Sequence, residues 1–186
     1  MISLAQLWLP ILVAAIAVFA ASSVIHMFVK WHNTDYLKLG NEDDVRAVIR
    51  AGHAGTGQYV IPYCSDPKEM QKPEMLQKFK EGPVGFLVLR PPCEPSMGKP
   101  LGLWFLLNLV VALLAGYLAC RTLAAGSSFL QICRMVGIVT FAAYACGSAQ
   151  QAIWMGKPWG SAGKEIADAL IYAIVSALVF GWLWPR

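Results

Sequence analysis

Potential metal ligands are concentrated in one short stretch of the sequence, SSVIHMFVKWHNTDY, at residues 22–36. His26, His32 and Asp35 offer imidazole and carboxylate groups, which bind transition metals such as zinc, iron or copper. A structural metal site in a protein usually has about four ligands. A thiol such as that of Cys64, or a group from another span, would therefore have to complete the site.

The spacing of these residues limits what they can do together. His32 and Asp35 are three residues apart, so on a helix the carboxylate could orient the imidazole. If the first helix ran unbroken, His26 and His32 would lie about 9 Å apart along its axis and on separate faces, and they could not share an ion. The competing interpretation is a hydrated helix end that binds no metal.

These residues lie at the end of the first of four apolar stretches. A composition of 57% hydrophobic and 14% charged residues indicates a chain that is largely solvated by lipid. A helix needs about 20 mainly apolar residues to cross a hydrocarbon layer roughly 30 Å thick. Four stretches meet this requirement and have aromatic residues near most of their ends, namely Leu7–Val29, Leu101–Cys120, Phe129–Ile153 and Glu165–Trp184.

Charged residues are concentrated between the first two spans. Nineteen of the 26 acidic and basic residues lie between Lys30 and Lys99, ten of them basic and nine acidic. This near-neutral segment lacks the basic patch of a nucleic-acid-binding protein, so no nucleic-acid partner is expected. The sequence therefore predicts an all-α membrane protein, a four-transmembrane-helix bundle formed by residues 1–29 and 101–186, with a small α/β extramembrane cap in residues 30–100.

The cap has two apolar runs typical of strands, Gln58–Tyr63 and Val84–Leu89. The helical stretch Pro67–Glu81 lies between them, and strands joined through a helix are most often parallel. Parallel strands would place Cys64 and Cys93 beyond the same end of the sheet, where they could form a disulfide bond.

A second group of polar residues belongs to the spans themselves. Because the helices alternate in direction, the end of the first, the start of the second, the end of the third and the start of the fourth lie on one membrane side. Polar groups in hydrocarbon are unfavourable unless they are paired, which predicts a polar cluster at this bundle mouth. Its members are His26, Asn108, Gln150, Gln151, Glu165 and Asp168.

Three interpretations of this cluster remain open. The polar side chains could form interhelical hydrogen bonds that hold the bundle together. They could instead form a binding or relay site, in which His26 and Asp168 hold a proton, a metal, a haem or a polar headgroup. The third interpretation is that Glu165 and Asp168 act only as favourable acids at the start of a helix, with Lys164 reaching Asp168.

The sequence contains no recognisable catalytic constellation, since Ser22 and Ser23 lie one turn from His26 but no oxyanion-hole motif or GxSxG accompanies them. We therefore expect an accessory or partner-binding membrane subunit without catalytic activity of its own. Its partners would be the lipid bilayer and another membrane protein or a second copy of the chain. The alternative is a membrane protein that binds a metal or haem through the His/Asp cluster at the bundle mouth.

Two signals bear on membrane orientation and they disagree. Six basic residues at the span ends on the side of the cap, against three on the other side, favour a cytoplasmic cap. The tendency of basic residues to lie on the cytoplasmic side is weak for a connection of about 70 residues. A Cys64–Cys93 bond would also require an oxidising compartment. We expect the cap to be extracytoplasmic.

The segments SSVIHM, HNTDY, GQYVIPYC, EGPVG and GWLWPR, taken in order, resemble uncharacterised bacterial four-span membrane proteins of similar length. The resemblance covers nearly the whole chain. It implies a location in the bacterial plasma (inner) membrane and assigns no catalytic residue.

Overall fold

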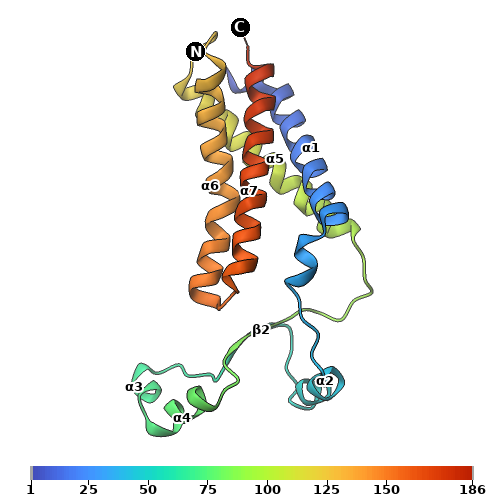
Figure 1. Cartoon of the computed structure of the whole chain (residues 1–186), viewed down its shortest axis with the longest axis vertical. Coiled ribbons are helices and arrows are strands. Elements are labelled where there is room, and N and C mark those ends of the chain that lie inside the picture. The colour runs from blue at the N-terminus through green and yellow to red at the C-terminus, as the bar shows by residue number, and fades with distance from the viewer. Residues whose placement is uncertain (1, 186) are drawn as a thin grey trace. The chain divides into compact units, whose positions relative to one another are not determined.

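Four long helices dominate the computed structural model, which describes residues 2–185 (Figure 1). They are long and apolar enough to cross a membrane, which confirms the four predicted spans as far as length and composition can. The first consists of η1 (Leu4–Leu7), α1 (Trp8–Val24) and η2 (Ile25–Val29), and the others are α5 (Gly98–Thr122), α6 (Phe129–Met155) and α7 (Trp159–Leu183).

The contacts between residues divide the chain into two compact units. Among the described residues, the first unit comprises residues 2–36, 96–152 and 157–185, and the second comprises Leu37–Pro95 together with Ile153–Gly156. The predicted division between spans and cap corresponds approximately to these units, with boundaries that differ by several residues.

In the first unit, α1 packs against both α5 and α7. Leu7 and Phe180 are fully buried in this core, and the alanines Ala14, Ala115 and Ala119 of the same cluster also have no exposed surface. Small residues allow helix backbones to approach closely, and close packing is the main attraction between helices in lipid. Close packing of alanines and a few large apolar side chains therefore forms the core of the four spans.

The fourth helix starts earlier than the hydropathy pattern predicted. The predicted span begins at Glu165, whereas α7 begins at Trp159 after the N-cap residue Pro158, whose carbonyl oxygen accepts a hydrogen bond from the Ala162 amide at 3.1 Å. The additional turns place Ser161 and Lys164 on the same helix as Asp168. All three of these residues contribute to the site described below.

The second unit contains α2 (Glu42–Ala51), α3 (Pro67–Met70), α4 (Pro73–Glu81) and a two-stranded sheet. Its strands, β1 (Gly57–Ile61) and β2 (Gly85–Leu89), are antiparallel, with Gly57 opposite Leu89 and Ile61 opposite Gly85. The predicted parallel pairing is therefore wrong. The connection contains two short helices, and it brings β2 back beside β1 in the opposite direction.

This strand direction also removes the basis of the proposed disulfide bond. Cys64 follows the end of β1 that is paired with the start of β2, whereas Cys93 follows the opposite end of the ladder. Both thiols are free in the structure. The pair consequently gives no support for an oxidising compartment.

We expect the packing around Gly116 to limit bundle stability. A Cβ atom at Gly116 would lie 3.2 Å from Ile11 and 3.3 Å from Phe180. Gly116→Leu should therefore lower the free energy of unfolding by about 1–3 kcal/mol through overpacking. Gly147→Leu is the matched control, because no atom lies within 4 Å of an added Cβ there. Thermal unfolding in detergent measures both, and equal stability of the two variants would contradict the described packing.

Candidate functional site at the bundle mouth

The chain changes direction just after the first span. The helix ends in the π-helical turn η2, and Lys30 then adopts a left-handed backbone conformation with φ 57° and ψ 18°. A short 3-10 turn, η3 (Trp31–Thr34), follows directly. The helix is thus broken between His26 and His32, so the two histidines are not separated as they would be on one continuous helix.

This break brings the two imidazole rings together. The ring centroids of His26 and His32 are 4.9 Å apart, and the ring planes differ by only 9°. His26 hydrogen bonds through Nδ1 to the Ser22 carbonyl oxygen at 2.9 Å. His26 is exposed, whereas the His32 side chain is only 14% exposed.

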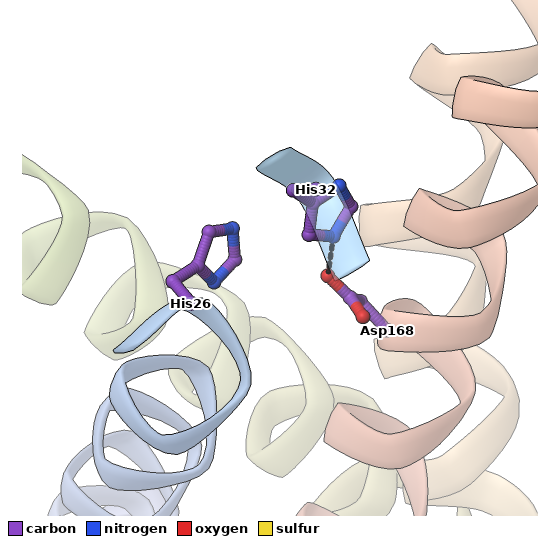
Figure 2. Close-up of side chains that lie close together, drawn as sticks. All are labelled: His26, His32 and Asp168. Carbon is purple, nitrogen blue, oxygen red and sulfur yellow. Dashed lines mark hydrogen bonds and ion pairs between the residues drawn. The ribbon is translucent and has the colours of Figure 1, made fainter. Parts of the chain in front are cut away.

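His32 lies between two carboxylates. Its Nδ1 is 2.7 Å from Oδ2 of Asp35, which brings together the pair expected from the three-residue spacing. Its Nε2 is 2.9 Å from Oδ2 of Asp168 on α7, a residue 136 positions away in the chain (Figure 2). The side chains of Asp35 and Asp168 are only 11% and 7% exposed.

Lys164 ties the η3 turn to α7. Its ammonium group donates three hydrogen bonds of 2.7 Å, to the carbonyl oxygen of Trp31, the hydroxyl of Thr34 and Oδ1 of Asp35. The Ser161 hydroxyl also donates to Oδ1 of Asp35, at 3.0 Å. We refer to His26, His32, Asp35, Lys164 and Asp168 as the mouth network.

The charged neighbours of Asp35 and His32 in the mouth network shift the pKa values of both residues. The Lys164 ammonium and His32 hold the pKa of Asp35 well below its usual range, at about 2. Burial alone would lower the pKa of His32, but its hydrogen bonds to Asp35 and Asp168 raise that pKa above the ordinary 6.5. The partners of Asp35 thus favour its carboxylate form, and the two carboxylates favour the protonated form of His32.

One polar atom in the network has no protein partner. Oδ1 of Asp168 is buried and accepts no hydrogen bond. Buried polar atoms are nearly always hydrogen-bonded, because desolvation without compensation costs roughly 1–3 kcal/mol or more for a charged group. This oxygen, like Nε1 of Trp31 in the η3 turn, is therefore an exception to that rule.

The other predicted members of the polar cluster form separate groups. Asn108 accepts a hydrogen bond from the Tyr144 hydroxyl at 2.7 Å. Glu165 is paired with Lys157 and accepts from the Ser148 hydroxyl at 2.7 Å. Lys157 also donates to Gln151 at 3.3 Å, while Gln150 is exposed. Of the six residues of the predicted cluster, only His26 and Asp168 belong to the mouth network.

Cys64, the remaining candidate ligand, belongs to the second unit, where its thiol donates to the Asp66 carbonyl oxygen at 3.2 Å. The sequence did suggest a role for Lys164, but with the wrong acid. At i+4 it was expected to reach Asp168, whereas in the structure it contacts Asp35. A contact between chain segments about 130 residues apart carries no local sequence signal.

Three residues of the network could hold a metal ion. His26, His32 and Asp168 each offer one ligand atom, and these atoms all lie within 4.8 Å of one another. A haem with two histidine ligands would need them on opposite faces of the porphyrin. Two imidazoles stacked against each other do not have that arrangement, so the pair does not fit such a haem.

Searches for similar proteins found no matching family model, no matching curated protein and no matching solved structure. Function is therefore inferred from the residues of this chain.

We expect Lys164 to hold the η3 turn in place. In Lys164→Met the three hydrogen bonds are lost, and backbone amides of residues 31–35 should exchange with solvent at least about tenfold faster, because charged hydrogen bonds stabilise by roughly 1.5–3 kcal/mol. Lys157→Met is the control, since that ammonium contacts Glu165 and Gln151. Hydrogen–deuterium exchange measures both variants. Unchanged exchange in Lys164→Met would mean that other contacts fix the turn.

Proposed function

We propose that this protein is a non-catalytic accessory subunit of the bacterial plasma membrane that binds another membrane protein through the segment Leu37–Pro95. The observation that carries this proposal is the burial pattern of that segment. The segment buries none of its residues by its own packing, although it contains helices and a paired sheet.

A folded segment of this size normally has an apolar core of its own. Ordering a residue costs roughly 1–2 kcal/mol of backbone entropy, and burial of apolar surface at about 25 cal/mol per Å² is the main compensation. A two-stranded sheet alone is at best marginally stable in water. The segment therefore needs an external surface on which its apolar side chains can be buried.

The sheet presents such side chains on both faces. Val60 and Phe86, which are opposite each other in the ladder, are 41% and 45% exposed, and Val88 on the same face is 59% exposed. The opposite face carries Tyr59 and Leu87, which are also paired. Neither strand contains a charged residue, although charges are the usual protection of free strand edges.

The helices of the segment add further apolar surface. α2 has three acidic residues in its first turn and an apolar side that includes Val48, which is 71% exposed. Val48 lies one turn after Val45, so both belong to the same side of the helix. An exposed apolar strip on a helix is a common recognition element for a partner protein.

The charge balance favours a protein surface over a lipid surface. Residues 37–95 contain eight basic and eight acidic residues, so their net charge is zero. Segments that bind anionic bilayers through electrostatic attraction carry an excess of Lys and Arg. Exposed apolar side chains combined with equal numbers of both charges are more typical of a protein interface.

Site-specific photocrosslinking in cells tests this proposal on the full chain. A photoreactive side chain at Val88 should give an adduct with one discrete membrane protein, whereas the same group at the exposed polar residue Glu94 should give little. Adding Val48→Asp should lower the yield of the Val88 adduct at least about tenfold, which corresponds to about 1.4 kcal/mol of lost binding. Adducts only with lipid, with a second copy or within the same chain would contradict an accessory role.

A further inference from the structure

We propose that His26, His32 and Asp168 bind one divalent transition-metal ion of the zinc, cobalt or iron(II) type. The three residues come from η2, η3 and α7, and their ligand atoms lie within 4.8 Å of one another. The ligand atoms of a tetrahedral ion with bonds of 2.0–2.1 Å are roughly 3.3 Å apart. Closing these separations by up to about 1.5 Å, and rotating one of the two stacked rings so that both lone pairs point at one ion, would complete the site.

In both histidines, the hydrogen bond made by Nδ1 leaves Nε2 as the nitrogen that can bind a metal ion. The Ser22 carbonyl oxygen can only accept a hydrogen bond, so Nδ1 of His26 carries a proton. The ionised Asp35 likewise accepts from Nδ1 of His32. In the neutral ring, a protonated Nδ1 leaves the lone pair on Nε2, which is the usual way in which proteins orient a metal-binding histidine.

Asp168 provides the independent indication of a cation. Its side chain is 93% buried, and its Oδ1 has no hydrogen-bond partner. Its other oxygen, Oδ2, faces Nε2 of His32, as Figure 2 shows. A metal ion between these two atoms would replace the proton that they share, and it would also compensate the unpaired oxygen electrostatically.

The donor set selects the kind of ion. Two imidazole nitrogens and one carboxylate oxygen suit zinc and iron(II), whereas magnesium and calcium prefer oxygen ligands alone. No thiolate is among the three ligands, which disfavours copper(I). Three protein ligands leave at least one coordination position for water or another exchangeable ligand, unlike the closed four-ligand sites of structural zinc.

Asp35 and Lys164 are positioning residues in this proposal. Asp35 holds His32 through Nδ1, and Lys164 holds Asp35 through a 2.7 Å hydrogen bond. Loss of such an outer partner typically weakens metal binding 10–100-fold without removing a ligand. The Asp35→Asn variant should therefore keep all three metal ligands but bind the metal ion with reduced affinity.

The full chain, purified in detergent without a histidine tag and stripped with a chelator, is titrated with zinc against a chromophoric competitor. We expect about one zinc per chain, no competition from magnesium, and a cobalt(II) form with visible absorption. His26→Phe, which keeps an aromatic ring beside His32, and Asp168→Asn should each weaken zinc binding by at least about 100-fold. His53→Asn is the matched control, because His53 is exposed in the second unit and its left-handed backbone is tolerated by asparagine.

The proposal is overturned if the wild-type chain binds well below one zinc, or if His53→Asn weakens binding as much as His26→Phe does. It is also overturned if His26→Phe binds zinc like the wild type, since the mouth network would then be an ion-pair network only. Should Asp168→Asn fail to fold, as judged by helical circular dichroism and gel filtration, His26→Phe alone decides, because the exposed His26 is not needed for packing.

Discussion

The left-handed backbone of Lys30 is the constraint on which the bundle mouth depends. A non-glycine residue in this conformation costs roughly 1–2 kcal/mol, so it persists only where other contacts require it. Here those contacts are the three hydrogen bonds of Lys164 to the η3 turn and the pairing of His32 with Asp168. Without the change of direction, the first helix would carry His32 away from His26.

The two units differ in how much of their side-chain surface they bury. In the first unit, alanines and a few large apolar residues pack closely, and several polar side chains are paired at the mouth or between helices, although Oδ1 of Asp168 and three other buried polar atoms have no partner among the described residues. In the second unit, short helices and a two-stranded sheet leave every residue at least partly exposed. The first unit therefore has buried apolar clusters of its own, and the second has apolar side chains that need a further surface.

The proposed partner surface and the proposed metal site lie close together in the sequence. Asp35, the residue directly after the η3 turn that carries His32, lies two positions before Leu37, where the exposed segment begins. An ion bound by His26, His32 and Asp168 would join the end of the first helix to α7. It would thereby fix the chain at the point from which the partner-binding segment continues.

The sequence alone determined the four spans and the His32–Asp35 pair, because apolar length and a three-residue spacing are local properties of the chain. It also indicated both strands, but not their antiparallel direction, which depends on how a connection of 23 residues folds back. Only the tertiary structure decided that His26 stacks on His32, that Lys164 binds Asp35 and that Asp168 completes the mouth network. These contacts join segments that are distant in the chain or separated by a backbone break, and no local pattern specifies them.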